Sequence, residues 1–177
     1  MKERLILGID PGLQKVGWGI VTKAQEGVDR ASDHSGLYQF SHVASGLIKT
    51  HNKDDLSDRI WHIFDQIKGI LGQYKIEMVA IENTYVNENY QSSLKLSHAR
   101  AAIIVACMEI GLKPIEYQAK TIKKTITGNG NATKDQVVYM LKHCLGGMPQ
   151  RMVSLDVSDA LAIAVCHGFC NDTSSIF

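Results

Sequence analysis

The sequence lacks the features that mark a membrane protein or a secreted one. Its longest apolar run, AAIIVACM, is ended by Glu109 and falls well short of the roughly 20 apolar residues that a transmembrane helix needs. The N-terminal segment MKERLILGID contains only a short apolar run, which leads into an acidic turn and not into a cleavage site. We therefore expect neither membrane insertion nor secretion.

Paired cysteines of the CxxC type, which zinc and redox sites use, are also missing. The four cysteines lie singly in apolar helical patterns, at Cys107, Cys144, Cys166 and Cys170. Such positions predict buried, reduced thiols, which are usual in the cytoplasm. The sequence thus favours a cytoplasmic protein.

Internal repeats and low-complexity tracts are absent, and the net charge is only +1. A chain of 177 residues with 45% hydrophobic and 21% charged residues has the composition of an ordinary globular protein. Its length is enough for one well-buried domain. We expect a single domain over residues 1–170 and a short, flexible C-terminal tail over residues 171–177.

The distribution of charge says more than its sum. The segment 90–151 holds nine Lys or Arg residues and three acids, whereas the rest of the chain holds ten basic residues and fifteen acidic ones. A basic middle beside acidic flanks suits a phosphate-binding surface next to a metal centre. Chance clustering on solvated helices is the plainer interpretation of such a pattern.

Four acids stand at positions where a metal-dependent nuclease would need them. Asp10 closes the apolar run LILGID and Glu82 closes MVAIE, so each carboxylate should emerge at the end of a buried strand. Asp156 and Asp159 lie three residues apart in a helical pattern, which brings both to one surface. Converging carboxylates repel one another and are tolerated mainly when divalent cations neutralise them. A magnesium site is the hypothesis.

The apolar patterning predicts a mixed sheet flanked by helices. Two strands joined by a Pro-Gly turn should form a hairpin, and the long polar stretch over 24–35 should separate them from the third strand. We expect strands in 5–10, 16–22, 36–50, 78–82 and 113–117, and helices over about 54–73, 92–110, 119–127, 133–145 and 154–169.

Five segments together resemble the RuvC family of bacterial Holliday junction resolvases. They are GIDPG, AIEN, SLKLSHARA, KTIKKTITGNGNATKDQV and DVSDALAIA, and the collinear match runs from about residue 4 to 168. The resemblance implies a ribonuclease H-like α/β fold, with a five-stranded mixed sheet and helices on both sides. The sequence departs from the family pattern at two places: the 24–35 stretch is longer than usual, and the tail from Cys170 lacks any motif.

The resemblance also implies roles for particular residues. It makes Asp10, Glu82, Asp156 and Asp159 the catalytic acids that hold magnesium, with two ions per site and manganese as a substitute. The third of these positions varies in the family, where histidine can occupy it. The resemblance places Lys123 and Lys134 near the scissile phosphate and Tyr85 against bases at the junction centre, and Lys124 and Arg100 complete the predicted DNA-binding set.

The implied activity is that of a crossover junction endodeoxyribonuclease that cuts two opposing strands of a four-way DNA junction in recombination and repair. Two symmetric cuts suit a twofold dimer, and the family is homodimeric. The segment 101–108 is apolar on most sides, as expected for a helix that also meets a partner chain. A branch-migration motor of the RuvA–RuvB type is the further partner implied.

Three other functions compete with this one. An actin-like phosphotransferase shares the first strand and glycine turn, but it needs a second phosphate loop and an adenosine pocket, for which the chain is too short. A DNA-binding module without catalysis would have no need of all four acids. A related nuclease acting on RNA or on other DNA branches is disfavoured, less firmly, by the SLKLSHARA and TGNGNATK segments.

Overall fold

The computed structural model describes residues 4–23, 39–83, 90–147 and 154–173. Six strands form one mixed sheet in the order β5-β4-β1-β2-β3-β6. The strands are β1 (Leu5–Asp10), β2 (Lys15–Lys23), β3 (Phe40–Lys49), β4 (Ile76–Asn83), β5 (Ile115–Gln118) and β6 (Leu145–Gly146). The predicted 24–35 stretch lies outside the described residues.

Strands β1 and β2 form the predicted antiparallel hairpin, in which Leu5 pairs with Thr22 and Asp10 with Gly17. On its other side β1 pairs in parallel with β4. Alternate residues of these strands point to opposite faces of the sheet, and both faces are covered. Leu7 and Ile9 enter one core, while Ile6 enters the other. The buried central strands of the sequence prediction are confirmed.

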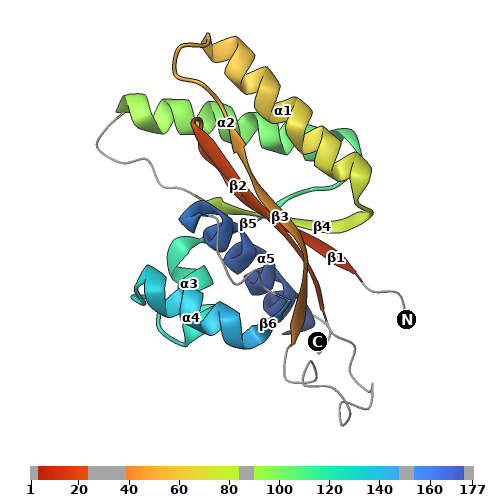
Figure 1. The fold of residues 1–177 in the computed structure, drawn as a ribbon, viewed down its shortest axis with the longest axis vertical. Coiled ribbons are helices and arrows are strands. Elements are labelled where there is room, and N and C mark those ends of the chain that lie inside the picture. Colours follow the sequence, from red (N-terminus) through yellow and green to blue (C-terminus); the bar gives the residue numbers. More distant parts are fainter. Residues whose placement is uncertain (1–3, 24–38, 84–89, 148–153, 174–177) are drawn as a thin grey trace.

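Helices of the described ranges cover both faces of the sheet (Figure 1). Their bounds are α1 (Leu56–Gln73), α2 (Tyr90–Glu109), α3 (Ala119–Thr127), α4 (Lys134–Cys144) and α5 (Leu155–Thr173). Helices α1 and α2 pack on one face, and α3, α4 and α5 pack on the other. None of the helices in the described ranges is long and apolar enough to cross a membrane.

Two features differ from the sequence prediction. The sheet has a sixth, two-residue strand, β6, which pairs with Phe40 and Ser41 of β3 at a point where the pattern predicted the end of a helix. So short a strand carries no periodicity of its own, and it exists only because the fold places the end of α4 where these two residues pair with β3. Helix α5 also continues to Thr173, beyond the boundary drawn at residue 170.

None of the four cysteines is joined in a disulfide, as predicted. Cys107 and Cys166 are buried, and Cys144 and Cys170 are half-buried. Burial raises the pKa of the Cys107 thiol to about 12, because the charged thiolate loses its hydration. These thiols therefore pack as small apolar side chains.

Helix α5 approaches the β1–β2 hairpin closely because glycines face it. A Cβ atom at Gly8 would overlap the backbone oxygen of Ala160, and one at Gly17 would overlap that of Asp156. Both glycines therefore allow backbone to lie against backbone. This contact brings the first turns of α5 to the end of β1, where Asp10 lies.

Candidate active site

Asp10 and Glu82 leave the sheet side by side. Strands β1 and β4 are parallel neighbours, and the pairing of Ile9 with Ile81 puts the two acids that follow them next to each other in register. Side chains alternate along a strand, so both carboxylates share the face of Gly8, the face that α5 covers. The sequence prediction that each acid follows a buried strand is confirmed.

Asp156 and Asp159 reach the same end of the sheet from the start of α5. Asp10 pairs across the hairpin with Gly17, and Gly17 lies against the backbone of Asp156. The i,i+3 spacing then brings Asp159 to the same side of the helix as Asp156. Segments far apart in the sequence thus deliver four acids to one region.

The electrostatics of this region confirm that the acids act on one another. Burial, together with repulsion from the other three carboxylates, raises the pKa of Asp10 from 3.8 to about 7. The pKa of Glu82 is raised as well, first by burial and then by the charge of Asp159. The region therefore has a strongly negative potential that a cation would relieve.

Two predicted lysines face these acids. Lys134 is the first residue of α4, whose N-terminus is fixed by a capping box between Thr133 and Gln136. Its Nζ donates a hydrogen bond of 2.7 Å to Oδ2 of Asp159, and this bond raises the pKa of Lys134. The positive charge of Lys123 on α3 partly opposes the rise in the pKa of Glu82, so Lys123 also lies within electrostatic range of the acids.

The donor set fits a hard divalent cation, because all four side chains offer carboxylate oxygens and Mg²⁺ prefers such ligands. Among the described residues, however, no three His, Cys, Asp or Glu side chains already lie in an arrangement that would hold an ion. Asp159 is instead engaged with Lys134. The structure thus shows the predicted gathering of the acids but not a preassembled coordination shell.

The remaining predicted DNA-binding residues have different surroundings. Lys124 is exposed in the last turn of α3. Arg100 is half-buried, forms an ion pair with Glu116, and donates a hydrogen bond of 3.1 Å to Oδ1 of Asn83. Arg100 thus ties α2 to β4 and β5. Tyr85 lies outside the described residues.

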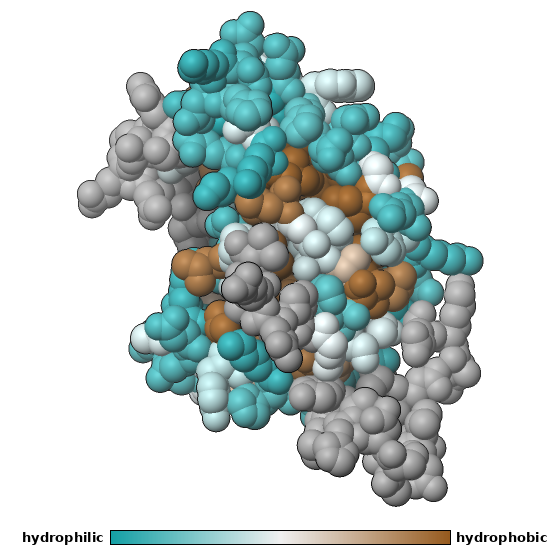
Figure 2. Space-filling model, in the orientation of Figure 1, coloured by the Kyte–Doolittle hydropathy of each residue, from teal (hydrophilic) through white to brown (hydrophobic). Residues whose placement is uncertain are grey.

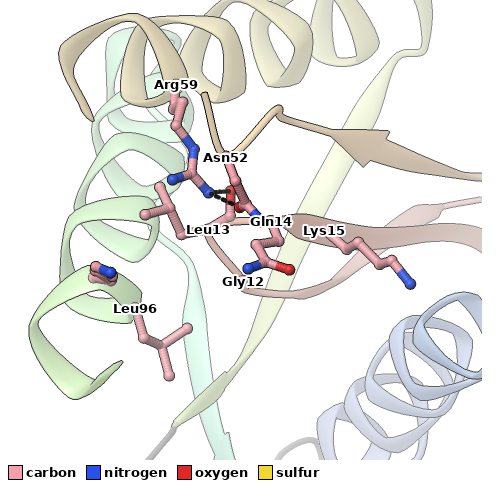
Figure 3. A pocket seen from close by; sticks show the side chains of 8 residues that line it. Gly12, Leu13, Gln14, Lys15, Asn52, Arg59 and Leu96 are labelled. Atoms are coloured by element: carbon pink, nitrogen blue, oxygen red, sulfur yellow. Dashed lines mark hydrogen bonds between the residues drawn. The ribbon is translucent and has the colours of Figure 1, made fainter. Parts of the chain in front are cut away.

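The sequence analysis missed Arg59, which is only 8% exposed. Figure 3 shows its side chain reaching from α1 to the turn between β1 and β2. The guanidinium donates hydrogen bonds to the carbonyl oxygen of Leu13 and to the side chains of Thr50 and Asn52. One signal was present in the sequence: Arg59 precedes buried Ile63 by four residues and so lies on the buried side of α1.

The architecture is the ribonuclease H-like α/β fold, and comparisons with known proteins define the family. The model of the family described as crossover junction endodeoxyribonuclease RuvC matches residues 6–167. The protein of that name from Citrifermentans bemidjiense is 38% identical over 98% of this chain and 97% of its own length. That from Geobacter sp. strain M21 is 40% identical, over 92% of this chain and 91% of its own.

The structure is similar to that of T. thermophilus RuvC in complex with Holliday junction substrate. The TM-score is 0.83 and the sequence identity 27%, and the match covers 97% of this chain and 96% of that one. The protein belongs to the RuvC family of crossover junction endodeoxyribonucleases. The resemblance found in its sequence is confirmed.

Proposed function

We propose that the protein cuts four-way DNA junctions by magnesium-dependent hydrolysis at Asp10, Glu82, Asp156 and Asp159. The observation that carries the proposal is the convergence of Asp10 and Glu82, at the ends of paired strands, with the start of α5, and the raised pKa of Asp10 agrees with it. A cluster of this kind at the end of a sheet suits divalent cations. The RuvC proteins named above supply the class of substrate.

The four acids would hold one or two Mg²⁺ ions, with Mn²⁺ as a substitute. Bound there, the metal would activate a water and neutralise charge on the phosphate. Asp10 lies between the other acids, since Glu82 neighbours it on one side and the start of α5 on the other. It is therefore the carboxylate best placed to contact two ions.

The two lysines would act on the substrate phosphate. Lys134 already contributes a positive charge beside Asp159, and DNA or metal entering the site would compete for this ion pair. Released from Asp159, its ammonium would stabilise charge that grows in the transition state. Lys123 would hold the phosphate in register. Lys124 and Tyr85 extend the proposed DNA contacts beyond this centre, to the backbone and to a base.

Arg100 plays a less direct part in this proposal. Its ion pair with Glu116 and hydrogen bond to Asn83 are already made. Asn83 directly follows Glu82 on β4. Arg100 would therefore hold β4 in place next to Glu82 through Asn83, and it would contact DNA only with the guanidinium hydrogens that these two contacts do not use.

A homodimer suits the exposed face of α2. Leu94, Val105 and Met108 are 60%, 57% and 51% exposed, and with Ala101 they form one apolar stripe along the helix. The opposite side of α2 is buried in the core. In the view of Figure 2, apolar surface lies across the middle of the molecule, while the described parts of its upper and lower ends are mainly hydrophilic. Pairing of two α2 helices would bury the stripe and give two related sites.

We further propose cytoplasmic action beside a branch-migration motor of the RuvA–RuvB type. Four thiols that form no disulfide support a reducing compartment. The motor is expected from the family alone, and its contact surface is not assigned to any residue of this chain.

A cleavage assay tests the proposal. A synthetic mobile four-way junction is incubated with the protein in Mg²⁺, in Mn²⁺ or in EDTA, with a linear duplex and an RNA–DNA hybrid as controls. We expect paired nicks in the junction alone, and only with a divalent ion. Preferential cleavage of the hybrid would replace the proposal with a ribonuclease activity.

Variants of the acids separate cleavage from binding. Glu82→Gln keeps the shape of the side chain and removes its charge, so it should abolish cleavage and leave junction binding in place. Glu77→Gln, on the same strand but away from the site, is the matched control and should cut normally. Near-normal cleavage by Glu82→Gln would contradict the proposed metal site.

A further inference from the structure

A second basic feature lies beside the acidic cluster. A groove of about 590 Å³ is bounded by the β1–β2 turn, by the start of α1 and by α2. Among the residues that the structure describes, its charged lining residues are Lys15, Arg59 and Lys95, and none is an acid. The rest of the lining is neutral and includes the backbone of Gly12. The groove therefore has a positive potential next to a negative site.

Arg59 makes this groove unusual, because it is a buried cation that forms no ion pair with any described acid, although Asp54, Asp58 and Asp65 line a neighbouring pocket with it. Its side-chain hydrogen bonds go to neutral acceptors, the nearest being Oγ1 of Thr50 at 3.0 Å and the carbonyl oxygen of Leu13 at 3.3 Å. Burying an unpaired charge costs free energy, and a bound anion would offset this cost. The guanidinium also offers a planar fork that matches phosphate oxygens.

The two lysines of the groove are exposed and make no ion pair within the described part of the chain. Lys134 by contrast is paired with Asp159, and Lys68 with Glu109. In Figure 3, Lys15 extends from the far side of the turn toward α5, away from Arg59. Lys15 and Arg59 therefore lie on different sides of the turn, and Lys95 lines the groove from α2. Positive charges spread in this way suit a chain of phosphates better than one small anion.

The position of the groove relates it to the reacting strand. Gly12 follows Asp10 by two residues, so the groove begins within about 7 Å of the Asp10 Cα. Each DNA strand carries one charge per roughly 3.4 Å of helix axis. A strand with one phosphate at Asp10 therefore brings the next one or two phosphates to the turn.

From this geometry we infer that the groove of Lys15, Arg59 and Lys95 is a second phosphate-binding subsite, which holds the DNA backbone beside the cleaved bond. The inference rests on the proposed action on DNA. The subsite positions the strand, and Arg59 serves it in two ways: it fixes the Leu13 carbonyl of the turn and it supplies buried positive charge. The acids then meet a strand that is already in register.

The first test removes the two exposed charges and leaves Arg59, which the fold needs, in place. Lys15→Gln/Lys95→Gln is compared with Lys113→Gln/Lys142→Gln, which removes two exposed lysines from other surfaces. Binding of a fluorescein-labelled four-way junction is measured by anisotropy over a range of salt, with Ca²⁺ in place of Mg²⁺. We expect the groove variant to flatten the slope of log K against log salt by about 0.9 for each lost contact, and the control to keep the wild-type slope. Equal slopes for the two double variants would overturn the subsite.

The second test finds the phosphate. Single phosphates on either side of the scissile bond are replaced by uncharged methylphosphonates, and the affinities of wild type and groove variant are compared. When the substituted phosphate is the one that occupies the groove, the wild type should bind the junction more weakly. The groove variant should bind the substituted and the unsubstituted junction equally well, because it has already lost the contact. Equal losses for both proteins at every position would refute the inference.

Cleavage in Mg²⁺ is scored separately, so the two proposals fail in different ways. If the salt dependence of binding depends on the groove lysines but the wild type does not cut, the subsite is supported and the proposed hydrolysis is refuted. If the wild type cuts but the slope of log K against log salt does not depend on the groove lysines, the hydrolysis is supported and the subsite is refuted.

Discussion

Asp10→Asn should stabilise the metal-free protein while it abolishes cleavage. The Asp10 carboxyl is half-buried among three other acids, and its pKa is raised from 3.8 to about 7. A raised pKa means that the folded protein holds the charged form less well than the unfolded chain does. Asparagine has nearly the same shape and no charge, so it removes this penalty.

The magnitude follows from the pKa. Its rise by about 3, at about 1.4 kcal/mol for each pKa unit, gives a penalty of about 4 kcal/mol as an upper bound above pH 7. For a protein of this size that corresponds to an increase in Tm of up to about 8–16 °C. The folded state binds more protons than the unfolded state between pH 4 and 7, so wild-type stability falls as pH rises through this window. The advantage of the variant should therefore be largest at pH 8 and disappear near pH 4.

The assay is thermal unfolding followed by far-UV circular dichroism, in EDTA, at pH 4, 6 and 8. Asp65→Asn, an exposed change on α1, is the control and should leave Tm unchanged at each pH. Adding Mg²⁺ at pH 8 should then raise the Tm of wild type and barely affect Asp10→Asn, because ligand binding stabilises only the state that binds it. Equal Tm values for wild type and Asp10→Asn at pH 8 in EDTA would refute the electrostatic reasoning.

Three further changes test other parts of the structure. Lys134→Ala should slow junction cleavage by about 10²–10³-fold in single-turnover assays with little loss of binding, as expected for a group that stabilises the transition state; an unchanged rate would remove Lys134 from the site. Val105→Glu places a charge in the apolar stripe of α2 and should shift sedimentation toward the monomer, whereas an unaltered profile would show that this stripe is not the interface. Gly8→Val should destabilise the protein by roughly 3 kcal/mol or more in urea unfolding, because its side chain would overlap the backbone of Ala160; a loss below 1 kcal/mol would mean that α5 moves away at little cost.

Much of the fold follows from local pattern. The hairpin, the buried β4 strand and the helices at α1 and α4 each have a periodicity or a cap that lies within a few residues. Thr133 is an example, because its capping box with Gln136 depends only on residue types three positions apart. The four acids were recognisable for a similar reason, since each sits at the end of an apolar pattern or in a helical repeat.

Other features have no local signature. The two residues of β6 become a strand only because α4 brings them beside β3. The role of Gly17 depends on Asp156, which lies far along the chain. The burial of Arg59 depends on a turn whose Leu13 carbonyl oxygen accepts a hydrogen bond from it. The ion pair of Lys134 with Asp159 also requires α4 and α5 to be neighbours.

The sequence by itself determined which residue types stand at the strand ends and helix starts, and with them the family and its chemistry. Only the tertiary structure decided that the acids come together, that Lys134 pairs with Asp159, and that the groove lined by Lys15, Arg59 and Lys95 lies beside them. The physical reason is range. Backbone conformation is set by neighbours along the chain, whereas burial and Coulomb interactions depend on distances in space that the fold alone fixes.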